Sequence, residues 1–143
     1  CDALALAAED EPELLIDFST LTGSARSALG PEVGAMFSNR DDVAADLVAA
    51  GIEFDDAVWR LPLHRPYRAM LDSKVADTVN SASSPMAGAI TAALFLERFV
   101  GDTAWVHFDI HAFNTRSRPG RPEGGEATAS RAVFGYLQQR FGR

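Results

Sequence analysis

The chain has 143 residues, of which 47% are hydrophobic and 23% are charged, and its formal net charge at pH 7 is -7. This length suits one compact domain with a single core, and the ordinary apolar content excludes a wholly disordered chain. The acidic balance argues against nucleic acid as a partner, because phosphate binding needs a concentrated basic surface. A local basic patch remains at residues 116–121, "RSRPGR".

The cysteine content and the hydropathy pattern both indicate the cytoplasm. Cys1 is the only cysteine, so no internal disulfide can form, which fits a reducing compartment. No apolar run reaches the roughly 18 residues needed to cross a bilayer, and we expect no membrane partner. Residues 1–12 have a helical composition but start without a capping lead-in, so we expect further residues upstream in the natural protein.

Three apolar runs have the length and composition of β-strands. They lie at residues 13–18, 33–39 and 103–110. Between the second and third runs, residues 57–67 contain two prolines, which restrict the preceding residues to extended backbone. We therefore expect an extended connection there.

Helical patterns separate these strands. The turn after the first strand leads into a short helix closed by Gly30. The next helix covers 41–51, with Asp41 or Asp42 as its cap and Gly51 as its stop.

Two further helices follow towards the C-terminus. Ser84 and Pro85 supply a cap and a first-turn proline for a helix at 86–101, the clearest in the chain. This helix is apolar nearly all round, so it should lie deep in the domain or between subunits. After a polar loop, residues 130–141 have the pattern of an amphipathic helix.

Strands that alternate with helices predict an α/β fold with a mostly parallel sheet flanked by helices. We see one domain over residues 1–143, with no internal repeat. Because ligands bind outside the carboxyl ends of strands in open α/β sheets, the loops after strands 13–18 and 103–110 should meet at one rim and form a site.

The strand "HFDIH" places His107, Asp109 and His111 at alternate positions, and therefore on one face. Such residues lie about 6.5–7 Å apart, so two can chelate a metal ion but three rarely converge. The other interpretation is that these side chains bond to neighbouring groups at the strand's end. The residues alone leave both readings open.

The turn "STLTGSA", residues 19–25, leaves the first strand at the same rim. Gly23 permits a close backbone approach, and Thr20 and Thr22 add hydroxyl groups, so the turn could hold a peptide main chain or an anion. It is equally compatible with an ordinary turn capped by Thr22 or Ser24. A nucleotide site is disfavoured because the lysine-bearing phosphate loop is missing.

Five stretches of the sequence together resemble the C-terminal part of the catalytic domain in the leucyl aminopeptidase (cytosol aminopeptidase) family. They cover most of residues 1–114 in the family's order and spacing: "CDALALA", "IDFSTLTGSARSALG", "WRLPLHRPYRAMLDSKVADTVN", "AGAITAALFLERFV" and "WVHFDI". The resemblance implies that the parent protein is a metal-dependent aminopeptidase, which releases N-terminal amino acids from peptides, and that this chain is a C-terminal portion of its catalytic domain.

The resemblance also implies where the chemistry lies. The family's metal ligands, which are carboxylates and a lysine, and its catalytic arginine precede the part that matches this chain. We therefore expect two divalent ions, zinc or manganese, in the full-length protein, but no metal ligand and no catalytic residue in this segment. The segment alone should be inactive.

Substrate contact is what the resemblance transfers to this chain. Thr20, Leu21 and Gly23 match the turn that holds the peptide, and His111 and Asn114 match pocket-wall positions that are ordinarily small or apolar. Polar side chains there predict an altered specificity or a lost activity. The family forms hexamers, so the alternative function is a non-catalytic relative or an assembly module.

Overall fold

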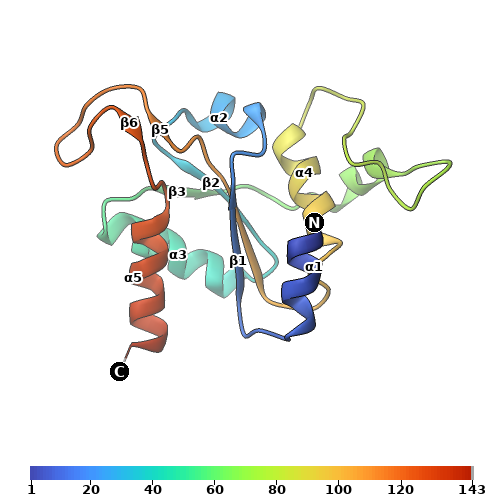
Figure 1. Ribbon diagram of the computed structural model, residues 1–143, viewed down its shortest axis with the longest axis horizontal. Helices are drawn as coiled ribbons and strands as arrows, with labels where there is room; N and C mark the ends of the chain where they lie inside the picture. Colours follow the sequence, from blue (N-terminus) through green and yellow to red (C-terminus); the bar gives the residue numbers. More distant parts are fainter. Residues whose placement is uncertain (143) are drawn as a thin grey trace.

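The computed structural model describes residues 1–142 and contains a four-stranded sheet with the order β1-β4-β2-β3 (Figure 1). Strands β1 and β4 are parallel, β2 and β3 are parallel, and β4 and β2 are antiparallel. The predicted α/β fold with a mostly parallel sheet is thus confirmed. The strands are β1 (Leu15–Ser19), β2 (Gly34–Ser38), β3 (Val58–Arg60) and β4 (Trp105–Asp109).

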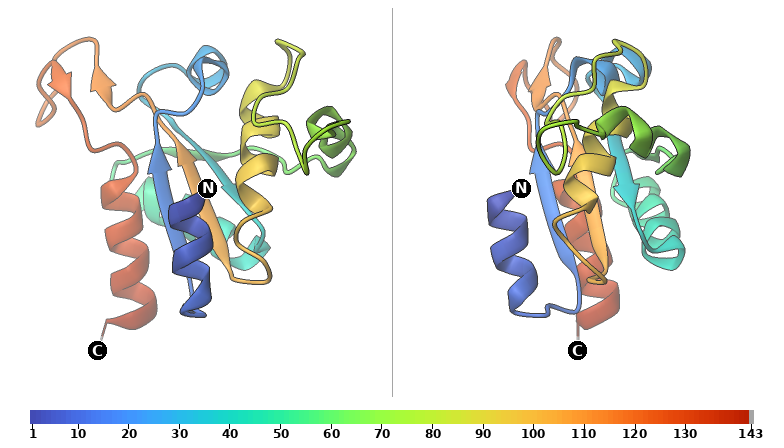
Figure 2. Two further views of the ribbon diagram at one scale, coloured as in Figure 1. Left: turned by 45° about the vertical axis from the view of Figure 1, so that its right-hand side comes forward. Right: turned by 90° about the vertical axis from the view of Figure 1, so that its right-hand side faces the viewer.

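Helices cover both faces of this sheet (Figure 2). On one face lie α1 (Asp2–Glu9), α2 (Gly23–Leu29) and α4 (Gly88–Glu97), and on the other lie α3 (Asp41–Glu53) and α5 (Ser130–Phe141). Alternation along β4 divides the core, because Val106 and Phe108 pack towards α3 and α5 whereas Trp105 packs towards α1 and α4. Within residues 1–142, none of the helices is long and apolar enough to cross a membrane.

The start of α3 differs from the prediction. Its N-cap is Arg40, and neither Asp41 nor Asp42 caps the helix with its side chain. The Ser38 hydroxyl accepts the Arg40 N–H at 3.1 Å, a bond that holds the N-cap residue but does not cap α3. Asp41 instead pairs with Arg60 at 2.5 Å.

The predicted stop of α3 at Gly51 was also wrong, since the helix continues to Glu53. Gly51 serves a close approach between elements. A Cβ atom at this position would lie 2.9 Å from the Asp56 carbonyl oxygen and 3.2 Å from a Val58 methyl group. The glycine therefore lets the strand β3 pack against the end of the helix.

Helix α4 begins later than predicted, at Gly88. The Ser84 hydroxyl accepts the Met86 N–H at 3.1 Å within a local turn, and Ala87 has a left-handed backbone with φ +58°. These features delay the helix past Ser84 and Pro85. The helix itself is largely buried by its own chain, which agrees with a deep position in the domain, and its predicted placement between subunits stays a prediction.

The segment between β3 and α4 contains a 3₁₀ helix, η1 (Arg65–Leu71), in the region predicted as extended. Glu97 in the last turn of α4 is buried at 7% exposure and bonds to Arg65 and Arg68 of η1. This buried ion-pair cluster fixes η1 to α4.

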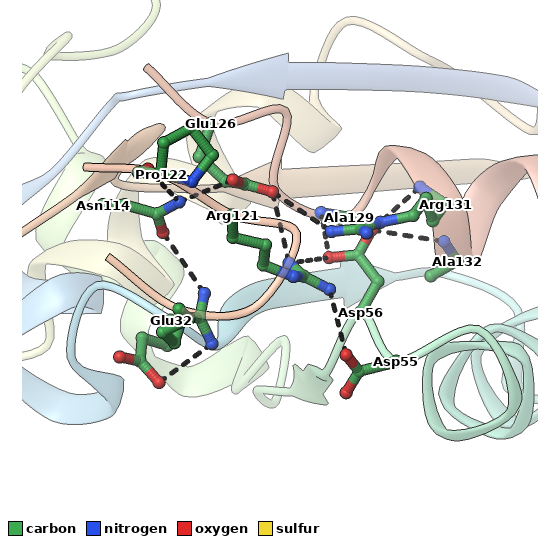
Figure 3. Close-up of polar contacts among 11 residues, drawn as sticks. Glu32, Asp55, Asp56, Asn114, Arg121, Pro122, Glu126, Ala129, Arg131 and Ala132 are labelled. Atoms are coloured by element: carbon green, nitrogen blue, oxygen red, sulfur yellow. Dashed lines mark hydrogen bonds and ion pairs between the residues drawn. The ribbon is translucent and has the colours of Figure 1, made fainter. Parts of the chain in front are cut away.

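The predicted polar loop after β4 contains a small hairpin, β5 (Phe113–Asn114) with β6 (Gly124–Gly125). Helix α5 follows it and is held by Asp56 from the α3–β3 loop. The buried Asp56 carboxylate accepts the backbone N–H groups of Ala129, Arg131 and Ala132 at 3.1, 2.8 and 3.3 Å (Figure 3). One side chain thus caps a helix that begins more than 70 residues later.

Candidate functional site

Strands β1 and β4 end side by side, at the rim from which α2 and the β5–β6 hairpin leave the sheet (Figure 1). Ser19 pairs with Asp109 in the parallel ladder, and the Ile110 N–H donates to the Ser19 carbonyl at 2.9 Å. The loops that follow these strands therefore start from the same point. The predicted meeting of the two loops is confirmed.

Thr22 and Asp109 join these loops. The Thr22 N–H donates to one Asp109 carboxylate oxygen at 3.1 Å, and the Thr22 hydroxyl donates to the other at 2.6 Å. The same hydroxyl accepts the Ala25 N–H at 3.2 Å and so caps α2. This pair, named the Thr22–Asp109 clasp below, holds the turn Thr20–Gly23 against the tip of β4.

His107 lies in the interior of the sheet and not at the rim. It is fully buried, its Nδ1 atom is 2.7 Å from Asp17, and its ring stacks on Trp105 and Phe37 at centroid distances of 5.9 and 6.0 Å. Trp105 donates its indole N–H to the second Asp17 oxygen at 2.8 Å. The Asp17 carboxylate thus ties β1 to β4 below the site.

His111 contacts two residues at the rim, Arg26 and Phe113. Its Nδ1 atom is 3.2 Å from a guanidinium nitrogen of Arg26 in α2, and its ring meets Phe113 edge to face at 6.3 Å. The next residue, Ala112, has a left-handed backbone with φ +55°, so the chain turns sharply after His111.

These contacts decide between the two readings of "HFDIH". His107, Asp109 and His111 bond to Asp17, Thr22 and Arg26 respectively, and so do not converge. Residues 1–142 contain no group of three or more His, Cys, Asp or Glu side chains that could hold a metal ion. The donors of this segment do not fit the dinuclear metal centre that the resemblance implies.

Asn114, predicted as a pocket-wall residue, is 2% exposed and faces the hairpin (Figure 3). Its amide nitrogen donates to the Pro122 carbonyl at 3.1 Å and to Glu126 at 2.6 Å, and its oxygen accepts from Arg118 at 3.2 Å. Its contact with a substrate stays a prediction, and its visible role is to hold the loop together.

The basic stretch 116–121 is neutralised by acidic partners. Glu32 accepts from Arg116 at 2.9 Å and from Arg118 at 3.0 Å, and the bond from Arg116 lowers the pKa of the Glu32 carboxyl below its ordinary value. Arg121 is buried and pairs with Glu126 at 3.2 Å (Figure 3). These guanidinium groups are engaged within the domain and do not form a free surface for phosphate.

A cleft of about 460 Å³ lies beside the turn Thr20–Gly23. Leu21, Thr22 and Ser24 form one wall, and the loop 80–85 forms the opposite wall. Sequence reasoning did not identify this loop as part of the site. The small side chains of this loop, "NSASSP", could have indicated the cleft in the sequence, because small side chains leave room beside the turn.

The fold and this rim define an α/β domain whose strand-end turn faces an open cleft, the usual position of a ligand site in this class. The sequence profile described as "Cytosol aminopeptidase family, catalytic domain" matches residues 1–134, and the chain belongs to this family.

Individual relatives agree with this assignment. A probable cytosol aminopeptidase of Syntrophotalea carbinolica is 42% identical over 140 residues, which are 96% of this chain and 28% of that protein. One of Stenotrophomonas maltophilia is 47% identical over 110 residues, 77% of this chain and 22% of that protein. The crystal structure of a cytosol aminopeptidase from Coxiella burnetii superimposes with a TM-score of 0.92 at 58% identity and covers 98% of this chain and 31% of that one. The chain thus spans less than a third of the relatives it matches.

Proposed function

We propose that this chain is the substrate-holding portion of a metal-dependent aminopeptidase, which releases N-terminal amino acids from peptides. One observation carries the proposal. Within residues 1–142, the backbone N–H and C=O groups of Thr20 and Leu21 enter no backbone hydrogen bond, although they stand at the rim beside the cleft. Unpaired backbone groups in an extended turn are the means by which a protein holds a peptide main chain.

The surrounding residues support this role. Thr20 is exposed and Leu21 is 43% exposed, so a peptide has access to the turn. The Thr22–Asp109 clasp fixes the turn before any substrate binds, which reduces the entropy lost on binding. Gly23 has no side chain, and the Arg26 guanidinium beside it bonds to His111 at 3.2 Å.

The chemistry of hydrolysis belongs to groups outside the described residues. The family is metal-dependent, and the donors of this segment do not fit the ions. We assign two divalent ions, zinc or manganese, to the remaining part of the full-length protein. The segment alone is then inactive, because it binds the substrate without supplying the metal ligands.

The setting of the reaction follows from the same proposal. We assign the peptidase to the cytoplasm, with peptides as its substrates and a homo-oligomer, a hexamer, as its working form. The names of the relatives, which refer to the cytosol, support the first assignment. Gel filtration with light scattering of the full-length protein tests the oligomer, and a monomeric mass contradicts it.

Kinetics of the full-length protein test the function. We expect hydrolysis of aminoacyl p-nitroanilides that stops on addition of a chelator and returns with zinc or manganese. Gly23→Val should raise KM more than it lowers kcat, because the new side chain enters the peptide site. Ala45→Val, at an exposed position of α3 on the other face of the sheet, is the control.

Two results contradict the proposal. One is a full-length protein that hydrolyses no aminoacyl substrate under any metal condition, which favours an assembly module. The other is metal-dependent peptidase activity in residues 1–143 alone, which would place the ions in this segment.

A further inference from the structure

Arg26 is an unusual arginine in this chain. Most of the others in residues 1–142 have a carboxylate within 4.0 Å, as the pairs of Arg60, Arg118 and Arg140 illustrate. Arg26 has no such partner in the described part of the chain, and its one hydrogen bond goes to His111. A guanidinium without a counter-charge at the rim of a binding site is available to a ligand.

The guanidinium of Arg26 lies between the two loops of the site. One terminal nitrogen is 3.2 Å from Nδ1 of His111 at the tip of β4. The other terminal nitrogen would be 3.6 Å from a Cβ atom built on Gly23. The charged group therefore stands beside Gly23, at the end of the turn that leads into α2. It is also accessible, since Arg26 lines a shallow depression with Gly23 and Ser24.

The protons on this pair follow from its chemistry. A guanidinium only donates hydrogen bonds, so Nδ1 of His111 is the acceptor and the ring proton of the neutral imidazole sits on Nε2. The pair consequently offers a ligand hydrogen-bond donors and a positive charge. It offers no acceptor, because Nδ1 of His111 already accepts from Arg26. Asp109, the carboxylate at the same strand tip, has both oxygens bonded to Thr22 and does not neutralise Arg26.

We propose that Arg26 and His111 recognise an acidic side chain, Asp or Glu, on the N-terminal residue of the peptide substrate. This inference rests on the proposed function. A carboxylate takes two parallel bonds from a guanidinium, which gives both affinity and geometry. A leucine side chain would cover the guanidinium without pairing it, which is unfavourable. Phe113 supplies an apolar contact for the methylene groups that precede the carboxylate.

Matched substrates on the full-length protein test the inference. Glutamyl, glutaminyl and leucyl p-nitroanilides compare a carboxylate with its neutral isostere and with an aliphatic chain. We expect the highest kcat/KM for the glutamyl substrate. Arg26→Gln should lower that value roughly ten- to a hundredfold, mainly through KM, because a charge-assisted pair is lost. The leucyl value should rise, because the variant removes the unpaired charge that the aliphatic chain would cover, and the glutaminyl value should fall far less than the glutamyl value.

Two variants separate recognition from structure. Arg26→Lys keeps the charge without the bidentate fork, so it should recover part of the glutamyl activity. Arg40→Gln removes an arginine that also lacks a carboxylate partner but lies at the other end of the sheet, where it donates to the Asp102 carbonyl at 2.7 Å. It should leave all three substrates unchanged.

A failure of this inference can be distinguished from a failure of the proposed function. Active enzyme that prefers the leucyl substrate, or whose glutamyl activity is unaffected by Arg26→Gln, overturns the inference and leaves the proposed function standing. Absence of hydrolysis of all three substrates overturns the proposed function, and this inference with it.

Discussion

Thr22 connects two loops of the candidate site through one hydroxyl, which donates to Asp109 and accepts from Ala25. Thr22→Val keeps the shape of the side chain and removes both bonds. We expect it to lower the free energy of unfolding by about 1–3 kcal/mol and to raise KM, because the turn loses its fixed position. Urea titration and peptide kinetics of the full-length protein measure the two effects.

Thr22→Ser is the control, since it retains the hydroxyl and should cost less than half as much. A Thr22→Val variant that is as stable as the natural protein, or less destabilised than Thr22→Ser, would contradict a stabilising role of the hydroxyl bonds.

At the same scale, the sequence predicted the rim residues but not their partners. Thr22 and Ser24 were alternative caps in one of the two interpretations of the turn, and the structure shows that Thr22 caps α2. The pair of Arg26 with His111 was not predicted, because the two residues are 85 positions apart and only the β1–β4 ladder brings them together. Asn114 showed no sequence signal for its bonds to Glu126 and Arg118.

Among the elements, α5 depends on a cap from outside its own sequence. Asp56→Ala leaves the N–H groups of Ala129, Arg131 and Ala132 without their acceptor and removes a carboxylate 3.6 Å from the buried Arg121, so we expect a loss of about 3–5 kcal/mol in unfolding free energy. Asp55→Asn is the control, because the Asp55 side chain is fully exposed and 3.8 Å from Arg121, and asparagine tolerates the left-handed backbone (φ +49°) of this position, so the variant should lower stability far less than Asp56→Ala.

Thermal unfolding of both variants, with circular dichroism, measures the difference. Similar midpoints for the two variants would contradict a special role of Asp56. Asp56→Asn keeps one acceptor oxygen and should fall between them.

Element boundaries were less predictable than element types. The period of apolar residues predicted β1, β2, β4, α3 and α5 because burial on one face imposes it. The predicted ends of α3 were wrong because Arg60 of β3 pairs with Asp41 and because Gly51 serves a close approach between elements. Both effects depend on residues that only the folded chain brings near the helix.

For the molecule as a whole, the network around Glu32 predicts sensitivity to acid. The pKa of Glu32 is lowered, chiefly by its hydrogen bond to Arg116, so the pair stabilises the fold above the ordinary value of 4.5. This stabilisation is lost as the pH falls through the lower pKa of the folded state. The Glu32→Gln variant lacks this stabilisation at every pH.

The difference in melting temperature between the natural protein and Glu32→Gln should therefore be largest at neutral pH and shrink below pH 4.5. High salt should also reduce this difference in melting temperature, since the Glu32 carboxylate is partly exposed. A difference that stays constant from neutral to acid pH would contradict the ionic origin.

The overall topology was predictable in class but not in detail. Alternating strands and helices indicated the α/β fold, and the shared rim of β1 and β4 followed from it. The antiparallel pairing of β2 with β4 did not follow from the fold class. Strand direction depends on how the long segment with η1 and α4 crosses the sheet. No local pattern in the sequence encodes that path.

The left-handed Ala112 has an evolutionary consequence. By reversing the chain between positions 111 and 114, it gives them neighbours that do not overlap: Arg26 for one, and Pro122, Glu126 and Arg118 for the other. Substitutions at the two positions should then be energetically additive. On the proposed function, a substitution at position 111 could then change which amino acids the enzyme accepts without disturbing the bonds that Asn114 makes in the hairpin.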